Sequence, residues 1–280
     1  MSVPIERAKM WRHVAHGLAS VLLPPACAVC RSPLAPSRVS IVCGLCVARL
    51  EPFANPRCAR CGHPRLSATT PLAPGSAHTG APDALPSCRW CEKLPAFVRA
   101  VRSACRMDRG TGTAMVHALK YDGWSGVAQA MALCMSHIDF PDDVVRERTA
   151  LVPLPLSTTR ERERGYNQAE RLATALAEHW RVPVWNDVVR RTRDTKSQVQ
   201  LTPSERTVNV LRAFTANGLA GSRLRGAHLV LVDDVITTAA TLNAAARALT
   251  DGGARIVSYI TFGRAPDPGD RAADFTSDQD

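Results

Sequence analysis

Residues 229–241 read LVLVDDVITTAAT, and this stretch decides the fold of the chain. Its four leading apolar residues predict a buried strand, and Asp233 and Asp234 follow them directly. Two neighbouring like charges repel each other, so the pair adds nothing to the stability of a core. We therefore interpret the two carboxylates as part of a site.

The chain beyond residue 95 alternates strand-like and helix-like stretches. Strand patterns occur at 96–107, 149–156, 228–235 and 255–264, β-rich stretches at 183–191 and 207–216, and helical patterns at 113–138 (broken at Asp122-Gly123), 167–180 and 241–254. This alternation predicts an α/β fold, a parallel sheet flanked by helices. Ligands of such sheets bind beyond the carboxyl ends of the strands, where the acidic pair is expected.

The segment that follows the acidic pair has the composition of an anion site. Thr237, Thr238 and Thr241 provide hydroxyl donors, and backbone N–H groups at the start of the next helix point toward an anion. The upstream carboxylates are suited to accept hydrogen bonds from vicinal hydroxyls, so a ribose 5-phosphate fits both ends. A Walker-type NTPase is excluded, because Lys196-Ser197 follows VRRTRDT, which lacks the glycines of a P-loop.

Composition restricts the partner and the compartment. The 280 residues suggest one or two domains, and the net charge of +10 favours nucleic acid or a phosphorylated metabolite, although a coding bias toward arginine would give the same excess. No stretch reaches the ~20 apolar residues of a membrane span, so no membrane insertion is expected. We predict a cytoplasmic protein, with a short helix at residues 1–22 rather than a signal peptide, and a disordered tail at 266–280.

Eight of the ten cysteines form four C-x-x-C pairs, the spacing of zinc knuckles: Cys27 and Cys30, Cys43 and Cys46, Cys58 and Cys61, Cys88 and Cys91. We predict two structural Zn²⁺ ions in two successive ribbons within residues 23–95, with a flexible insertion at 64–87. An alternative stays open, in which the first and fourth pairs share one ion and the second and third pairs share the other. A redox dithiol is disfavoured because it usually occurs once, and His63 and His78 are disfavoured as ligands because eight thiols suffice.

Several motifs together resemble the ComF family of competence-associated phosphoribosyltransferase-like proteins. They are the cysteine pairs, HALKYDG (117–123), VPLPLSTTRERERGYNQAERLA (152–173), RTRDTKSQVQLTPSERTVNVLRAF (191–214) and VLVDDVITTAAT (230–241). The last motif looks like the phosphoribosyl pyrophosphate (PRPP) signature of type I phosphoribosyltransferases. The ribbons and R-G-Y-N-Q distinguish ComF proteins from other members of that class, and the resemblance covers about residues 20–264.

The resemblance implies a type I phosphoribosyltransferase domain over 96–265 that binds PRPP with Mg²⁺. Residues 191–206 match a mobile hood over the site, and Ala239 departs from the glycine usual at its position. Arginines of the TRERERG stretch also fit a solvated helix start, and Lys120 also fits an ordinary surface position. The implied PRPP-binding residues are Asp233, Asp234, Val235, Thr237, Thr238, Ala239, Ala240, Thr241, Pro153, Leu154, Arg160 and Lys120, with Asp233, Asp234 and Arg164 as catalytic candidates.

Two functions are compatible with this resemblance. In the first, the chain transfers phosphoribosyl groups to an unidentified acceptor, for example as an amidophosphoribosyltransferase-like enzyme of nucleotide metabolism. In the second, it binds phosphoribosyl groups, including those of single-stranded DNA, and serves DNA uptake in natural transformation beside the competence helicase machinery. Residues 155–225 hold 13 Lys and Arg against 7 Asp and Glu, which suits a phosphate backbone, but an aromatic fraction of 5% is low for a base-stacking surface.

Overall fold

The computed structural model describes residues 25–35, 40–53, 55–64, 88, 90–107, 110–192 and 213–266 of the chain. Four predicted features lie outside these residues, wholly or for the greater part. They are the N-terminal helix (1–22), the insertion (64–87, of which only Pro64 is described), the hood (191–206, described only to Thr192) and the tail beyond residue 266.

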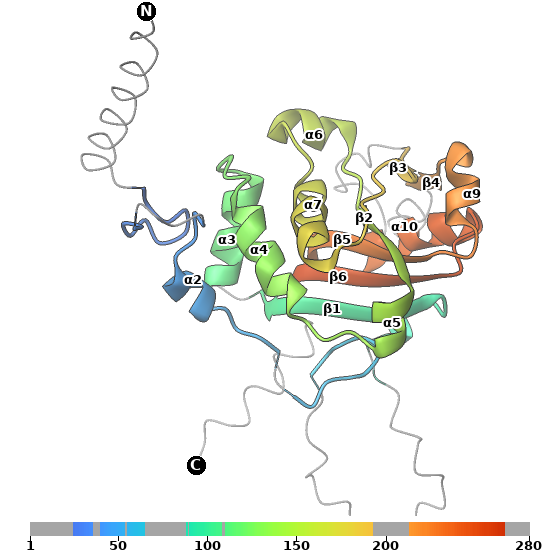
Figure 1. Cartoon of the computed structure of the whole chain (residues 1–280), viewed down its shortest axis with the longest axis horizontal. Helices are drawn as coiled ribbons and strands as arrows, with labels where there is room; N and C mark the ends of the chain where they lie inside the picture. Colours follow the sequence, from blue (N-terminus) through green and yellow to red (C-terminus); the bar gives the residue numbers. More distant parts are fainter. Residues whose placement is uncertain are drawn as a thin grey trace, which may run out of the picture.

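Four parallel strands form the central sheet of the described chain (Figure 1). In spatial order they are β1 (Val98–Arg106), β6 (Ile256–Arg264), β5 (His228–Ile236) and β2 (Arg148–Pro153). β5 and β6 are buried along nearly their whole length, as expected of strands that helices cover on both faces. The predicted α/β fold with a parallel sheet is confirmed.

The predicted helical stretches are present, with their ends set by local chemistry. The described helices are α2 (Gly44–Ala48), η1 (Cys91–Lys93), α3 (Thr111–Lys120), α4 (Val127–Ser136), α5 (Asp142–Glu147), α6 (Thr158–Arg164), α7 (Gln168–Trp180), η3 (Gly218–Ala220), α9 (Gly221–Leu224) and α10 (Ala240–Asp251). The chain turns between α3 and α4 at Gly123, whose φ of 70° suits glycine. Asn167 is the N-cap of α7, and its side-chain oxygen accepts a hydrogen bond from the N–H of Ala169. Within the described residues no helix is long and apolar enough to span a membrane.

The β-rich stretches and the short helices differ from the sequence prediction. Val189–Arg191 (β3) and Phe214–Ala216 (β4) pair antiparallel in a separate two-stranded sheet, so most of residues 183–191 is not strand. Val184 adds one parallel bridge to Leu151 of β2. Helices α5, α6 and α9 contain only six, seven and four residues. Such lengths give no readable helical period, which explains why the sequence did not predict them.

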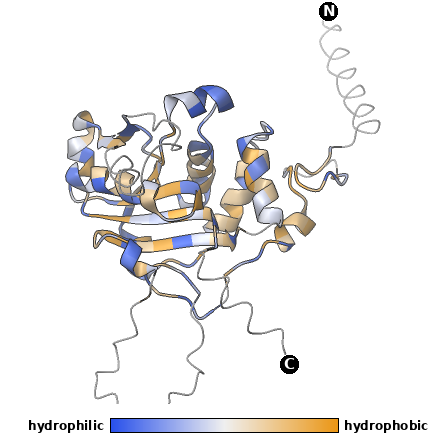
Figure 2. Cartoon of the chain, turned by 180° about the vertical axis from the view of Figure 1, so that it is seen from behind, coloured by the Kyte–Doolittle hydropathy of each residue, from blue (hydrophilic) through white to orange (hydrophobic). Residues whose placement is uncertain are grey.

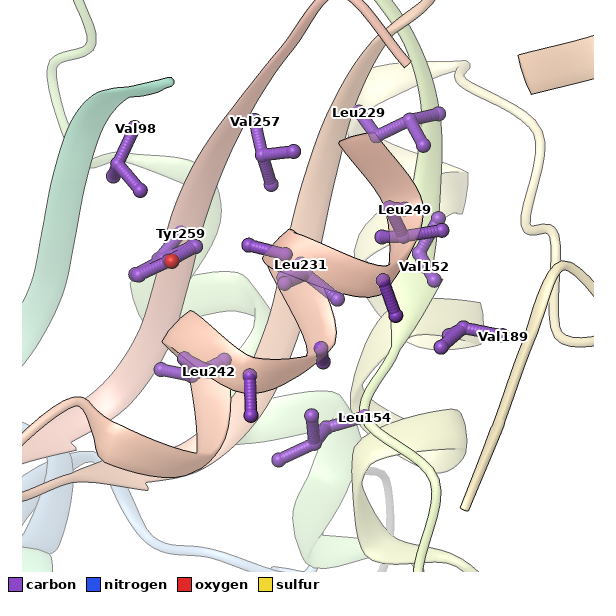
Figure 3. Close-up of a cluster of buried hydrophobic side chains, with 14 of the residues drawn as sticks. Val98, Val152, Leu154, Val189, Leu229, Leu231, Leu242, Leu249, Val257 and Tyr259 are labelled. Atoms are coloured by element: carbon purple, nitrogen blue, oxygen red, sulfur yellow. The ribbon is translucent and has the colours of Figure 1, made fainter. Parts of the chain in front are cut away.

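The sheet separates two hydrophobic cores. On one face, α10 packs with β3 and β4, and Figure 3 shows Leu242 and Leu249 of α10 among buried side chains that include Leu231 and Val257 from the sheet. We call this the α10 core. The other face is covered by α3, α4 and α7, which we call the α4 core. Figure 2 shows hydrophobic residues concentrated in the sheet and hydrophilic ones on α6.

Both cysteine-rich segments are integrated into these cores. Cys27 and Cys46 are buried in the α4 core, next to α3 and α4, and Figure 1 shows this segment beside α3. Cys58, Cys61 and Trp90 are buried in the α10 core with the strands of the sheet. Each segment therefore supports a different face of the sheet and is stabilised by it.

Replacing Trp90 tests this integration. Trp90 is 1% exposed, and truncation of a buried Trp to Ala costs about 3–5 kcal/mol of unfolding free energy. We expect Trp90→Ala to shift the single urea-unfolding transition of the sheet, followed by far-UV circular dichroism. Trp124→Ala, at a residue that is 37% exposed, is the control and should cost less than about 1 kcal/mol. An unchanged sheet transition in Trp90→Ala would contradict a shared core.

Candidate functional site

The acidic pair lies in the second half of β5, which continues two residues beyond it to Ile236. Asp234 is only 3% exposed, whereas Asp233 is half-buried. The N–H of Asp234 donates to Oδ1 of Asp233 over 2.8 Å, which fixes the orientation of the first carboxyl group. Nζ of Lys120, the last residue of α3, forms an ion pair with Oδ2 of Asp234. The structure thus joins two predicted site residues that are more than a hundred positions apart.

The environment of Asp233 disfavours a bare negative charge. Burial raises the pKa of its carboxyl group well above the usual value, and the neighbouring Asp234 carboxyl raises it further, while Lys120 acts in the opposite direction. A carboxyl group in this setting gains stability from a cation or a hydrogen-bond donor brought close to it. Hydroxyl groups of a ligand and a bound metal ion are such partners.

A left-handed turn connects the acidic pair to α10. Thr237 and Thr238 are exposed, and Ala239 has φ 64° and ψ 0°. Its glycine-like conformation explains why the family pattern has glycine there, and an alanine in this region is strained. The N–H of Ala240 donates to Oγ1 of Thr238 over 3.5 Å. α10 starts at Ala240, so the N–H groups of its first turn, which includes Thr241, have no acceptor within the helix and follow the acidic pair closely along the chain.

The carboxyl end of β2 adjoins β5 at the same edge of the sheet. Pro153 pairs with Val232, and the N–H of Leu154 donates to the carbonyl oxygen of Val232 over 2.9 Å. Both residues are buried. Nδ2 of Asn167 donates to the carbonyl oxygen of Leu154 over 3.1 Å and so holds the turn after β2. Val235, by contrast, pairs with Gly263 of β6 and packs on the α4 core.

The arginines of α6 divide into two kinds. Arg160 is exposed at the start of the helix, and its backbone N–H donates to Oγ of Ser157. Arg164, at the end of the helix, donates from Nη1 to Oε1 of Gln168 over 2.7 Å. Its guanidinium also lies 5.4 Å from the ring centre of Tyr121, the residue after Lys120. Arg164 therefore belongs to the neighbourhood of the acidic pair, and the structure gives no such contact for Arg160.

The R-G-Y-N-Q segment contributes residues to which the sequence assigned no individual role. The hydroxyl of Tyr166 donates to the carbonyl oxygen of Leu119, which precedes Lys120. Asn167 both starts α7 and holds Leu154. The motif therefore connects α6 and α7 to the end of α3 and to the turn after β2. The family motif marked this segment in the sequence, but its contacts with Leu119 and Leu154 join distant parts of the chain and follow no local pattern.

The eight paired cysteines form two clusters, and their membership answers the question of connectivity. Cys27, Cys30, Cys43 and Cys46 form the first cluster, and Cys58, Cys61, Cys88 and Cys91 form the second, each with all sulfur atoms within 4.8 Å of one another. The Sγ–Sγ distances are 3.9 Å for Cys27–Cys46 and 3.6 Å for Cys30–Cys43, and 3.5 Å for both Cys58–Cys91 and Cys61–Cys88. A tetrahedral ion with Zn–S bonds of about 2.3 Å requires about 3.8 Å. Two successive four-cysteine sites are therefore confirmed, and both are consistent with zinc.

Hydrogen bonds favour the thiolate at Cys27 and Cys30, whereas burial raises the pKa of the Cys46, Cys61 and Cys91 thiols. N–H groups of Val29 and Cys43 donate to Sγ of Cys27 over 3.5 and 3.3 Å. Contacts with Ser32 lower the pKa of the exposed Cys30 thiol to about 6. Beside the second cluster, the buried guanidinium of Arg264 donates to the carbonyl oxygen of Cys61 over 2.5 Å. A zinc ion with four thiolates carries a net negative charge, which would offset the buried charge of this arginine.

Known proteins share both halves of this arrangement. The Phosphoribosyl transferase domain family matches residues 163–275, and the Double zinc ribbon domain family matches residues 18–92. The DNA utilization protein YhgH of Salmonella typhi is 30% identical over 243 residues, which cover 84% of this chain and 95% of that protein. The chain belongs to the ComF/YhgH family. Competence protein ComFC of Bacillus subtilis is 39% identical over 116 residues, 41% of this chain and 44% of that protein. Competence protein F of Haemophilus influenzae is 34% identical over 116 residues, 41% of this chain and 50% of that protein.

Membership of the ComF/YhgH family confirms the resemblance inferred from the motifs. The phosphoribosyl transferase match contains β5, the turn and α10, and the zinc ribbon match contains both cysteine clusters. Family membership does not by itself assign ligand contacts to single residues. Those remain proposals that rest on the geometry above.

The strained turn gives a direct prediction. Ala239→Gly removes the cost of a left-handed alanine, roughly 1–2 kcal/mol, and adds roughly 0.5–1 kcal/mol of unfolded-state entropy. We expect a net stabilisation of about 0.5–1 kcal/mol in urea unfolding. Ala240→Gly, one residue later and inside the helix, should destabilise by about 0.5–1 kcal/mol. Destabilisation by Ala239→Gly would show that the methyl group, which is 4% exposed, contributes more through packing than it costs in strain.

Proposed function

We propose that the chain binds PRPP with Mg²⁺ at the carboxyl end of β5. One observation carries the proposal: Asp233 and Asp234 directly precede a left-handed turn that opens into the N-terminus of the twelve-residue helix α10. The carboxylates are suited to the ribose hydroxyls, and the turn from Thr237 to Thr241 is suited to the 5-phosphate. A ribose 5-phosphate presents these groups at opposite ends of one small molecule.

The other residues of the site have complementary tasks in this proposal. Lys120 forms an ion pair with Asp234 and provides positive charge beside the leaving pyrophosphate. The turn at Pro153 and Leu154 borders the region that the pyrophosphate would occupy, and Arg164 adds a nearby guanidinium. Mg²⁺, when bound, would neutralise charge on the pyrophosphate. If a nitrogen acceptor attacks C1 of the ribose, a C–N bond forms, the bond from C1 to the pyrophosphate oxygen breaks, and pyrophosphate departs with the bonding electrons.

The biological setting we propose is the handling of DNA. The matched relatives carry the names DNA utilization protein, Competence protein F and Competence protein ComFC. By analogy we assign this chain a role in the uptake or use of DNA, in the cytoplasm and beside the helicase machinery of competence. The net charge of +10 is compatible with a polyanionic partner.

Titration calorimetry with PRPP and Mg²⁺ tests the binding site. Wild type should bind, and the double variant Asp233→Asn/Asp234→Asn should lose at least about tenfold in affinity because its amides cannot replace the charged acceptors. Asp251→Asn, at the far end of α10, is the control and should bind like wild type. No binding by wild type overturns the proposal. Pyrophosphate release with a nitrogen acceptor would identify an enzyme, and binding without release would identify a binding module.

The pH dependence provides a second test of Asp233. Its raised pKa means that the carboxyl group takes up a proton at a higher pH than an ordinary carboxyl, so PRPP affinity should fall as the pH is lowered from about 8 to 5. The phosphate groups of PRPP also titrate in this range. Asp233→Asn controls for them, because it retains the titration of the ligand and lacks that of the carboxyl. Equal pH slopes in both proteins would rule out a titrating Asp233.

A second function, binding of single-stranded nucleic acid, is favoured by the loop between α3 and α4. Tyr121 and Trp124 in this loop are 66% and 37% exposed. Guanidinium groups of Arg164 and Arg31 lie 5.4 and 5.9 Å from the centres of their rings. Aromatic rings beside arginines provide stacking for bases and charge for phosphates. The scattered aromatics of the sequence thus include two exposed ones in the loop that follows Lys120.

Fluorescence anisotropy with a labelled oligothymidine tests this second function. We expect weak binding that declines steeply with salt, and a loss of roughly tenfold in Tyr121→Ala/Trp124→Ala. An abasic oligonucleotide of equal length should bind wild type and variant alike, because it offers phosphates without bases. Leu219→Ala, a 94% exposed residue at the opposite end of the sheet, is the control. A flat salt response, or equal binding of both oligonucleotides by wild type, would contradict the stacking surface.

A further inference from the structure

Asn243 connects the start of α10 to two other parts of the chain. Its backbone N–H donates to the carbonyl oxygen of Ala239 over 2.8 Å, so it lies in the first turn after the strained residue. Its side chain Nδ2 donates to the carbonyl oxygen of Lys93 over 2.8 Å. Its Oδ1 accepts a hydrogen bond from the hydroxyl of Tyr259 over 2.9 Å. Figure 3 shows Tyr259 of β6 in the buried cluster that also contains Leu242 of α10.

The carbonyl that Asn243 contacts belongs to the second cysteine cluster. Lys93 ends the short helix η1, which begins at the ligand Cys91. The N–H of Lys93 donates to the carbonyl oxygen of Trp90 over 3.3 Å. Nη2 of Arg60, which lies between Cys58 and Cys61, donates to the carbonyl oxygen of Pro95 over 2.7 Å. The direction of the Lys93 carbonyl therefore depends on a turn that the cluster itself closes.

Tyr259 fixes which end of the Asn243 amide faces the ribbon. Its hydroxyl donates to Oδ1, so Nδ2 is the group left to face Lys93. Tyr259 is fully buried at 0% exposure and cannot reorient without opening the core. A buried tyrosine thus orients an amide, and the amide joins the cysteine cluster to the predicted phosphate turn.

We propose that Asn243 is a positioning residue that makes binding of the ligand's 5-phosphate depend on an intact second cysteine cluster. The proposal rests on the proposed PRPP site. Asn243 does not contact the ligand; it holds the first turn of α10 in the orientation in which its free N–H groups point at the phosphate. When the second cluster loses its zinc, η1 loses its shape, the contact with Lys93 is lost, and phosphate affinity falls while the acidic pair stays in place.

The segment of the first cluster lies beside the loop between α3 and α4. Loss of the first cluster can therefore be compared with loss of the second. Nη2 of Arg31, which follows Cys30, lies 3.9 Å from Oδ2 of Asp122 in the loop between α3 and α4. The side chain of Ile41 packs against Gly126 at the end of the same loop. Within the described residues, the hydrogen bond from α10 to a cysteine-rich segment goes to the second one. Loss of the first cluster should therefore act on the Lys120 side of the site and not through Asn243.

Calorimetry with PRPP and Mg²⁺ tests the role of Asn243. Asn243→Ala and Asn243→Asp should each weaken binding about tenfold. The aspartate still accepts from Tyr259 but has no N–H for Lys93, so it isolates the contact with the ribbon. Zinc content should stay at two ions per chain in both variants, which separates positioning from loss of the cluster. Thr250→Ala, a polar residue in the last turn of α10, is the matched control. Wild-type affinity in both Asn243 variants overturns the proposal.

Double variants show whether the second cluster acts through Asn243. Cys91→Ser should weaken PRPP binding in the wild-type background and add little in the Asn243→Ala background. Cys30→Ser, in the first cluster, should have equal effects in the two backgrounds. Additive effects of Cys91→Ser and Asn243→Ala would mean that the cluster and the helix act independently, and would overturn the proposal.

Hydrogen exchange measures the coupling between the second cluster and the start of α10 without any need for PRPP binding. Chelation of zinc should speed amide exchange in residues 240–246 of wild type, with a much smaller change in the last turn of α10. The same treatment of Asn243→Asp should change little further, because the contact is already absent. Unchanged exchange at the start of α10 in wild type refutes the coupling. A failure of PRPP binding with changed exchange refutes the proposed function alone.

Discussion

The ion pair between Lys120 and Asp234 is the interaction on which the rest of the site depends. A carboxylate that is 3% exposed must have a cation in contact, because burial of an unpaired charge is very costly. Lys120 is the last residue of α3, so this helix has to end over the carboxyl half of β5. The hydroxyl of Tyr166 holds the preceding carbonyl of Leu119, which fixes the end of α3 from a third element. Side chains from α3, β5 and the R-G-Y-N-Q segment are therefore set in position together.

The two cysteine clusters extend this constraint to both faces of the sheet. The first cluster is buried with α3 and α4, on the face from which Lys120 approaches. The second is buried with α10 and contacts the first turn of that helix through Asn243. A parallel sheet of four strands has few internal means to fix the helices at its carboxyl edge. In this chain the two cysteine-rich segments, which precede the sheet in sequence, provide that fixation, one on each face.

The sequence predicted the features that depend on local pattern. The strand at 228–235, the helix at 167–180 and the break at Gly123 follow from apolar periodicity and from a glycine with positive φ, and the structure contains all three. Cysteine spacing likewise predicted both clusters. The contacts of Tyr166 with Leu119 and of Asn243 with Lys93 could not be predicted, because they join residues 47 and 150 positions apart and neither follows a periodic pattern. The position of Tyr121 and Trp124 in one exposed loop, with Arg164 and Arg31 beside their rings, could likewise not be predicted from composition.

The strain at Ala239 indicates that the turn proposed to bind phosphate is held in place by the fold itself. A left-handed alanine persists only where its surroundings determine the backbone, and here they do so on both sides. Upstream, β5 is hydrogen-bonded to β2 and β6. Downstream, the carbonyl oxygen of Ala239 accepts from the N–H of Asn243, whose side chain is itself held by Lys93 and Tyr259. A turn held in this way does not have to be ordered by the ligand, so its formation costs the ligand no conformational entropy. The same strain makes the turn sensitive to loss of either support, which is why a cysteine cluster outside the site can control it.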